Sequence, residues 1–245
     1  MSWWIVRALF IFSVAAPLAA SAQDVRNGRD VYGPCASCHG ANGEGGKGGE
    51  YPRLAGQPAS FIVESLKAFQ KRKRMNIPMF PYTEPRELSE RDMEDVAAFL
   101  VLIELPTKPP EFKETDSALD RLLAMERVLV VPRVDGDVAK GEALWGRKCA
   151  KCHGDGGLGK ESRSAPRLVG QYPAYLQRRF EELQKQARGP KGDDLMNGAL
   201  KELSGEDFTN VLAWLTSIQD ASGGTAPAPG AEDAPAGAPV PDASP

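Results

Sequence analysis

The chain has 245 residues, of which 42% are hydrophobic, so it is long enough to bury either one large core or two small ones. Its formal net charge is −3, and no excess of lysine and arginine marks it as a protein that binds a phosphate backbone. We therefore expect no nucleic-acid partner.

The first 22 residues have the features of a secretory signal peptide. Arg7 precedes an apolar run over residues 8–20, and the small residues "ASA" occupy positions 20–22. We predict cleavage before Gln23, which would place the mature protein in the periplasm. An uncleaved membrane anchor is the alternative, although the apolar run is shorter than the ~20 residues that a spanning helix needs.

All the cysteines and histidines of the chain fall in one short pattern written twice, "CASCHG" at 35–40 and "CAKCHG" at 149–154. The residues are Cys35, Cys38 and His39, then Cys149, Cys152 and His153. Cys-x-x-Cys-His is the attachment pattern of c-type haem: two thiols on one turn add across two vinyl groups, and the next histidine binds the iron. The sequence predicts two covalently bound haem c groups, with His39 and His153 as iron ligands.

Three other uses of these residues are open. An exported chain with four cysteines can form two disulfides, and Cys with His can build a structural zinc site or a thioredoxin-like dithiol. The spacing disfavours them, because zinc sites rarely carry histidine directly after Cys-x-x-Cys, and no strand-helix-strand pattern surrounds either motif.

The repeat extends beyond the two motifs. Cys149 follows Cys35 by 114 residues (149 − 35), and "PRLAGQ" at 52–57 recurs as "PRLVGQ" at 166–171 with the same offset. A short helix with an early glycine is expected before each motif, and each half then continues with apolar residues at helical intervals. The segments "LSERDMEDVAAFL" and "LSGEDFTNVLAWL" each combine a serine cap with aspartate three residues later. Both halves are therefore predicted to be all-α.

These patterns divide the chain into five parts. They are a signal peptide (1–22), a first domain (23–104), a linker (105–134), a second domain (135–220) and a disordered tail rich in Ala and Pro (221–245). Within the linker, "ALDRLLAMERVLVV" allows an amphipathic helix that packs between or across the domains. We expect Met125 in this segment, like Met93 in the last helix of the first domain, to fill a core.

The residues now resemble a known group, the class I c-type cytochromes, and in particular the tandem dihaem cytochrome c4 type. The resemblance covers about 28–102 and 141–217 and rests on Cys-x-x-Cys-His-Gly, Pro-x-Leu-x-Gly-Gln and the Leu-Ser-x-x-Asp helix. It implies two small helical domains, each around one haem. It also implies that Pro52 and Pro166, each thirteen residues after its histidine, offer their carbonyl groups to the proximal histidines.

In this group the sixth iron ligand is a methionine between the middle and last helices. All histidines and cysteines are already used, which leaves methionine as the leading candidate. In the second half the resemblance selects Met196. In the first half we choose Met79, which follows a proline and lies closer to the last helix, with Met75 as the alternative.

Two haems with His and Met ligands would carry single electrons and leave no iron position for a substrate. We expect redox proteins as partners: a donor dehydrogenase or quinol-oxidising complex, and an acceptor oxidase or reductase. Membrane contact is expected only through partner complexes or an uncleaved signal. The alternatives are a haem enzyme with one open iron, such as a dihaem peroxidase or a thiosulfate-oxidising cytochrome, and a fixed subunit of a larger redox complex that uses the linker helix as its contact surface.

Overall fold

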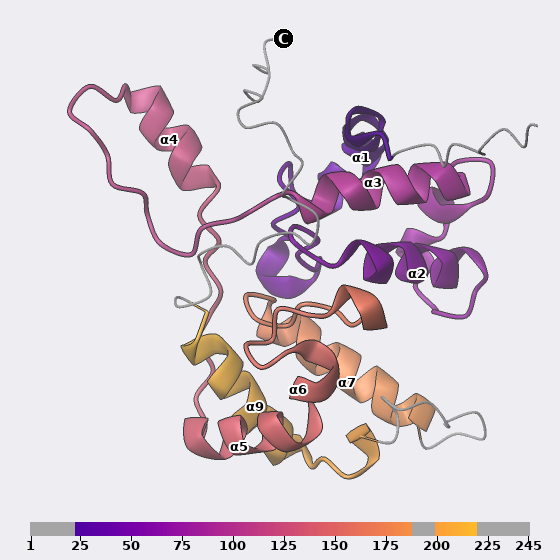
Figure 1. The fold of residues 1–245 in the computed structure, drawn as a ribbon, viewed down its shortest axis with the longest axis vertical. Helices are drawn as coiled ribbons and strands as arrows, with labels where there is room; N and C mark the ends of the chain where they lie inside the picture. The colour runs from indigo at the N-terminus through magenta and orange to yellow at the C-terminus, as the bar shows by residue number, and fades with distance from the viewer. Residues whose placement is uncertain (1–22, 188–198, 220–245) are drawn as a thin grey trace, which may run out of the picture.

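The part of the chain that the structure describes is helical, with loops between the helices. The computed structural model describes residues 23–187 and 199–219. These ranges contain no strand, and their extended pairings are two isolated bridges, Gly46 with Tyr51 and Lys160 with Ala165. The helices form two bundles, one above the other in Figure 1, which confirms the all-α prediction. The predicted signal peptide and residues 220–245 lie outside the described residues.

The first bundle consists of α1 (Val25–His39), α2 (Ala59–Gln70) and α3 (Glu90–Val101), with short 3-10 turns η1 (Lys47–Gly49), η2 (Ile77–Met79) and η3 (Pro81–Thr83). Helices α1 and α3 cross so closely that a Cβ on Gly28 would lie 2.0 Å from the carbonyl oxygen of Asp95. The main core cluster is Tyr32, Ile62, Val96, Ala97 and Leu100. Met93 is fully buried, as predicted.

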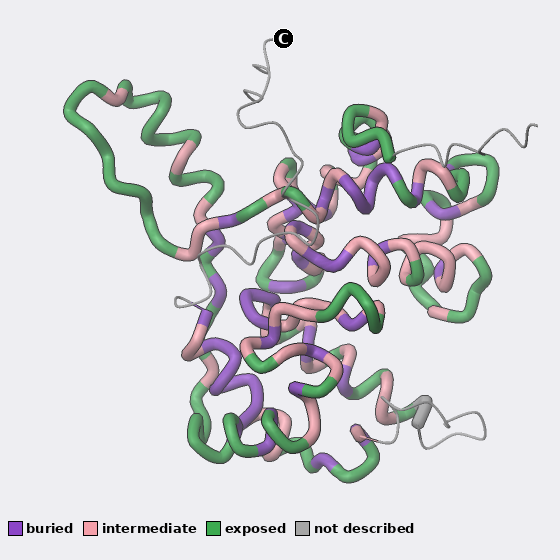
Figure 2. Tube along the Cα trace, viewed as in Figure 1, coloured by how far each residue is buried: buried purple, intermediate pink, exposed green. Residues whose placement is uncertain are grey.

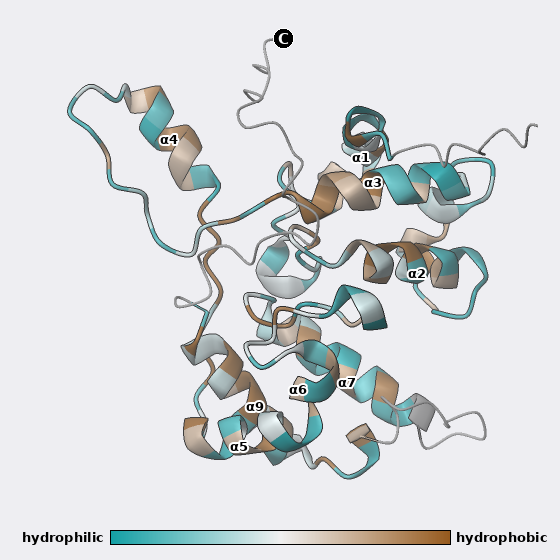
Figure 3. Cartoon of the chain, in the orientation of Figure 1, coloured by the Kyte–Doolittle hydropathy of each residue, from teal (hydrophilic) through white to brown (hydrophobic). Residues whose placement is uncertain are grey.

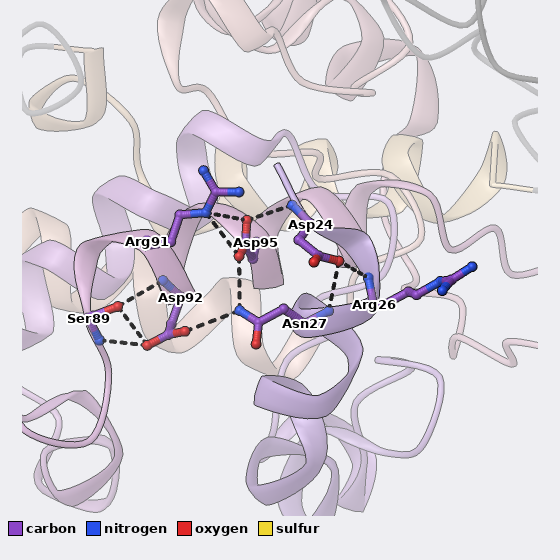
Figure 4. A network of polar contacts seen from close by, with 7 residues as sticks. All are labelled: Asp24, Arg26, Asn27, Ser89, Arg91, Asp92 and Asp95. Carbon is purple, nitrogen blue, oxygen red and sulfur yellow. Dashed lines mark hydrogen bonds and ion pairs between the residues drawn. The ribbon is translucent and has the colours of Figure 1, made fainter. Parts of the chain in front are cut away.

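Polar contacts at one end of this crossing join α1 to α3 (Figure 4). The buried carboxylate of Asp95 accepts hydrogen bonds from the backbone N–H of Asp24 at 2.8 Å and from the Asn27 amide at 2.9 Å, and it pairs with Arg91 at 3.1 Å. Burial by itself raises the pKa of Asp95, but these hydrogen bonds and the Arg91 charge outweigh it and hold the pKa below its ordinary value.

The second bundle repeats the first. It consists of α5 (Val138–Lys148), α6 (Ala150–His153), α7 (Pro173–Ala187) and α9 (Gly205–Ser217), with the 3-10 turn η4 (Glu161–Arg163). Gly141 takes the place of Gly28, since its Cβ would lie 2.0 Å from the carbonyl oxygen of Asn210. The bundles differ at the motif: α1 continues through it to His39, whereas in the second bundle the helix is interrupted at Cys149.

Both last helices begin with the predicted capping box. In α3 the Ser89 hydroxyl accepts from the backbone N–H of Asp92, whose carboxylate accepts from the N–H of Ser89. In α9, Ser204 and Asp207 make the same reciprocal pair. Each box satisfies backbone donors that a helix start leaves unpaired and so determines where the helix begins.

The linker contains the helix α4 (Ala118–Glu126), but this helix does not pack between the bundles. It projects from the body of the molecule, and none of its residues is buried (Figures 1 and 2). Met125 is exposed, so the predictions that Met125 fills a core and that the helix lies between the domains are wrong. The linker is attached to the first bundle at the base of this projection, where Leu105, Leu129 and Val131 are buried against Ala55. The Leu129 N–H also donates to the Pro106 carbonyl at 2.8 Å.

The two bundles contact each other through the repeated Pro-Arg-Leu-x-Gly-Gln segments. Gln171 accepts from the backbone N–H of Arg53 at 2.9 Å and donates to its carbonyl at 2.9 Å. Gln57 makes the same pair of bonds with Arg167, at 2.9 and 3.0 Å. Because equivalent residues of the two halves exchange equivalent contacts, the interface is self-complementary, like the interface of a twofold dimer.

Candidate haem sites

The last turns of α1 and the short helix α6 carry the two Cys-x-x-Cys-His motifs. All four cysteines are free thiols of intermediate exposure, which excludes the disulfide arrangement in this structure. Among the described residues, no three side chains of His, Cys, Asp or Glu converge as a metal-binding group, so a zinc site built from such a cluster has no support either. Burial raises the pKa of Cys149 to about 11, and it raises that of Cys35 as well, so both thiols are protonated at neutral pH.

Each histidine is buried and held by one backbone carbonyl group. His39 is 7% exposed and its Nδ1 lies 2.9 Å from the Pro52 oxygen, and His153 is 5% exposed with Nδ1 2.9 Å from the Pro166 oxygen. Since a carbonyl oxygen accepts, Nδ1 carries the proton in both rings, and Nε2 keeps its lone pair. Burial lowers the pKa of both histidines, although the carbonyl contact opposes it, which favours the neutral form that a metal requires.

Glycine turns bring the Pro-Arg-Leu segment back to the histidine. In the first bundle Gly45 donates its N–H to the His39 carbonyl at 2.7 Å, and in the second Gly159 does the same for His153 at 2.8 Å. Both glycines have positive φ, and a Cβ on either would lie 2.7 Å from a backbone oxygen of the returning segment. The turn therefore requires glycine at these positions.

Each half also contains an aromatic contact that was not predicted from the sequence. The Tyr32 hydroxyl donates to the Gly40 carbonyl at 2.6 Å, and Trp145 Nε1 donates to the Gly154 carbonyl at 3.0 Å. Each bond anchors the glycine directly after the histidine. The signal was present in the sequence, since an aromatic residue stands shortly before the first cysteine of both motifs.

The methionines predicted as possible iron ligands differ in their exposure to solvent. Met79 ends η2 and is half-buried, and Thr83 donates a hydrogen bond to its carbonyl at 3.2 Å. Met75 is 67% exposed. Met196 lies outside the described residues.

The buried position of Arg53 at the interface, beside the half-buried Arg167, was not predicted from the sequence. Arg53 is only 2% exposed, and burial together with the like charge of Arg167 lowers its pKa to about 9. Burial also lowers the pKa of Arg167, while the charge of Glu104 opposes this. The sequence shows the arginine repeated at the same offset, but not that the two guanidinium groups lie close together at the interface.

The residues of each site fit a covalently attached haem. Two thiols stand one helical turn apart, the following histidine presents a free Nε2, and a second segment orients that histidine through Nδ1. This donor set occurs twice, in the same arrangement.

Comparison with known families agrees with this assignment. Residues 25–103 match the family described as cytochrome c, and residues 136–215 match the family described as cytochrome c oxidase, cbb3-type, subunit III. Each match contains one Cys-x-x-Cys-His motif and one helical bundle. The fold, the motifs and these matches define a tandem c-type cytochrome with two covalently bound haem c groups.

Comparison with individual relatives shows to which family of tandem c-type cytochromes the chain belongs. The chain is 30% identical to cytochrome c4 of Thiocapsa roseopersicina over 195 residues. This match covers 76% of this chain and 88% of the relative. It is 28% identical over 183 residues to the thiosulfate dehydrogenase electron acceptor of Thiomonas intermedia, covering 75% of this chain and 77% of the relative. The fold matches that of reduced cytochrome c4 from Pseudomonas stutzeri with a TM-score of 0.59 at 21% identity, over 79% of this chain and 98% of that one. The chain belongs to the cytochrome c4 family, as its motifs predicted, and is an electron-transfer dihaem cytochrome.

Proposed function

We propose that this protein is a periplasmic carrier of single electrons that binds no substrate at either iron. The observation that best supports the proposal is the contact that occurs twice, between the buried histidine that follows each Cys-x-x-Cys and a proline carbonyl, at 2.9 Å in both bundles. When bound, the haem iron supplies reversible one-electron chemistry. The protein holds and orients its proximal ligand and keeps water away from it.

The roles of the individual residues follow from this arrangement. The thiols attach the porphyrins, and the histidines bind the irons through Nε2 because Nδ1 is already engaged with Pro52 or Pro166: Cys35, Cys38 and His39 serve the first haem, and Cys149, Cys152 and His153 the second. Met79 and Met196 complete the two ligand sets. Met79 is favoured over Met75 because Met75 is mostly exposed to solvent. Met/His ligation raises the reduction potential and leaves no open position on the iron.

The donor class is a dehydrogenase or a quinol-oxidising complex, and the acceptor is a terminal oxidase or reductase. A relative named as the electron acceptor of thiosulfate dehydrogenase supports a dehydrogenase as donor. Export by the signal peptide at 1–22 would place the protein in the periplasm with these partners. No helix of the described ranges is long and apolar enough to cross a membrane.

Optical spectroscopy of the purified holoprotein tests the proposal. Ferric and ferrous spectra are recorded with and without carbon monoxide or cyanide, for the unmodified protein and for the Met79→Ala, Met75→Ala and Met196→Ala variants. We expect two low-spin haems with a methionine-to-iron charge-transfer band, and no reaction with the added ligand. Met79→Ala and Met196→Ala should each open one iron to the ligand, whereas Met75→Ala, the matched control, should not.

A high-spin haem in the unmodified protein, or one that binds cyanide readily, would contradict the carrier proposal. It would support the enzyme alternative, a dihaem peroxidase or a thiosulfate-oxidising cytochrome, because such an enzyme needs an open or displaceable iron position.

A fixed subunit of a larger redox complex is a second candidate, and the linker favours it. Helix α4 projects away from both bundles and carries hydrophobic positions (Figure 3). The side chains exposed on it are Leu119, Leu122, Leu123 and Met125. Stable co-purification of a redox partner from the periplasm would support this candidate, whereas a freely migrating holoprotein would support the diffusing carrier.

A further inference from the structure

Two cations lie together where the bundles meet: Arg53 is buried and Arg167 is half-buried. Arg53 and Arg167 follow Pro52 and Pro166 directly, and each side chain approaches a glycine of the opposite bundle. A Cβ built on Gly170 would lie 2.7 Å from Nη1 of Arg53, and one on Gly56 would lie 3.7 Å from Nη1 of Arg167. The Cβ position of Gly56 is also 3.4 Å from Nη2 of Arg53, so both guanidinium groups surround the same point.

The contacts of these arginines do not neutralise their charges. Arg53 donates through Nε to the Ala55 carbonyl at 2.9 Å and through Nη1 to the Gly170 carbonyl at 3.4 Å, while Arg167 donates through Nε to the Val169 carbonyl at 3.1 Å. All of these acceptors are neutral. Within the described residues neither arginine forms an ion pair, and Glu104, whose charge acts on Arg167, is itself exposed.

Such an arrangement is costly without an anion. A buried charge is ordinarily paired, and here the buried Arg53 instead has a second, half-buried cation beside it. A guanidinium group has five donors in a planar fork, which matches a carboxylate better than any other common group in proteins. The chemistry of the site is therefore suited to carboxylates.

The haem carries carboxylates, its propionate side chains, and the site lies next to both haem positions. Arg53 is bonded to Pro52, whose carbonyl contacts His39, and Arg167 stands in the same relation to His153 through Pro166. We propose that Arg53 and Arg167 bind the haem propionates and that these carboxylates neutralise the interface between the bundles. The inference rests on the haem sites of the proposed function. It adds that docking of one bundle on the other depends on loading with haem.

Arginine variants of the holoprotein test this proposal through the reduction potentials of the two haems. The variants are Arg53→Gln, Arg167→Gln and Arg53→Lys, and the control is Arg178→Gln. Arg178 is an exposed arginine that also crosses the interface, where it donates to the Gly49 and Glu50 carbonyls at 2.6 and 3.1 Å. The control therefore removes hydrogen bonds between the bundles without removing a buried cation.

The glutamine variants should lower the potentials, because a lost positive charge destabilises the ferrous state, which holds the extra electron. The expected shift of the one-electron equilibrium is about tenfold, which corresponds to about 59 mV. Arg53→Lys keeps the charge and should stay near the unmodified protein. The propionate bending bands of the resonance Raman spectrum should move in both glutamine variants and stay in place in Arg178→Gln.

Unchanged potentials and propionate bands in both glutamine variants would overturn the inference, as would an equal shift in Arg178→Gln. The optical spectra keep this result separate from the carrier proposal. If all variants remain low-spin and bind no cyanide, the carrier proposal stands even where the propionate inference fails.

Discussion

Single residues in this protein are constrained mainly where backbones approach each other. Gly28 and Gly141 lie under the carbonyl groups of Asp95 and Asn210, and the absence of a side chain is what allows the first and last helices of each bundle to cross. These glycines are buried, so the usual entropic disadvantage of glycine in a helix is offset by the close packing of α1 on α3 and of α5 on α9.

Gly141→Ala should therefore destabilise the second bundle. Its Cβ would lie 2.0 Å from the Asn210 oxygen, and relief of this overlap needs a shift of α5 relative to α9. The expected loss is about 2–3 kcal/mol in the free energy of unfolding. Denaturant unfolding followed through far-ultraviolet circular dichroism measures it.

Gly146→Ala is the matched control in the same helix, since nothing lies within 4 Å of its Cβ position. It should leave stability unchanged or raise it by up to about 1 kcal/mol. An equal loss in both variants would show that helix crossing is not the cause.

In each bundle the first and last helices are joined by polar contacts as well as by an apolar core, and the polar contacts differ between the two bundles. At the crossing of α1 and α3, Asp95 is a buried carboxylate with three partners, two of them side chains. At the crossing of α5 and α9, Asn210 stands in its place, and its side-chain oxygen accepts the Asp137 N–H at 2.9 Å. At this position the first crossing has a charged residue and the second a neutral one, so only the first crossing should depend on pH through this position.

Asp95→Asn should lower the stability of the first bundle by about 1–3 kcal/mol at neutral pH, because the Arg91 and Asn27 bonds lose their charged acceptor. The folded-state pKa of Asp95 is depressed. Its contribution is therefore present above the unfolded-state pKa of about 3.9 and is lost as pH falls through the folded-state value. The difference between the two proteins should shrink below about pH 4.

Urea unfolding of both proteins from pH 3 to 7 checks this prediction. Asp120→Asn serves as control, because hydrogen bonds from Ser117 also lower the pKa of Asp120, but it lies on the projecting α4. A pH-independent difference for Asp95→Asn would contradict the proposed role of its charge.

At the scale of the whole molecule, the repeat of the sequence becomes a self-complementary interface. Gln57 and Gln171 each satisfy one N–H and one carbonyl group of the other half, and Arg53 and Gln171 are both buried. Peripheral contacts surround this centre, among them the Ser60 hydroxyl, which donates to the Glu161 carbonyl at 2.8 Å.

The double variant Gln57→Ala with Gln171→Ala should uncouple the bundles. It leaves backbone groups of Arg53 and Arg167 unpaired, at a cost of about 1–3 kcal/mol for each buried group. Calorimetry should then resolve two unfolding transitions, one for each bundle. In the unmodified holoprotein the two bundles should unfold together or at closer temperatures. Ser60→Ala, which removes a peripheral exposed contact, should leave the transitions as they are, and separate transitions already present in the unmodified protein would refute the coupling.

The features that could be predicted from the sequence are those that depend on residues close together along the chain. The two Cys-x-x-Cys-His motifs, the proline thirteen residues further on, the capping boxes and the helical periods are short-range patterns, and the structure has helices and histidine contacts where these patterns indicate them. The offset of 114 residues between the repeated motifs also indicates that the chain contains two similar halves.

How the two bundles and the linker pack together is determined by long-range contacts that short-range sequence patterns do not contain. The burial of Arg53 beside Arg167 and the contacts of the two glutamines depend on residues more than a hundred positions apart. The exposure of α4 depends on surfaces that no local pattern describes. An amphipathic pattern shows that a helix has an apolar face, but it does not show what covers that face, which is why α4 was expected to pack and instead projects into solvent. Likewise, the repeated arginine reads as an ordinary surface cation until the second bundle removes it from water.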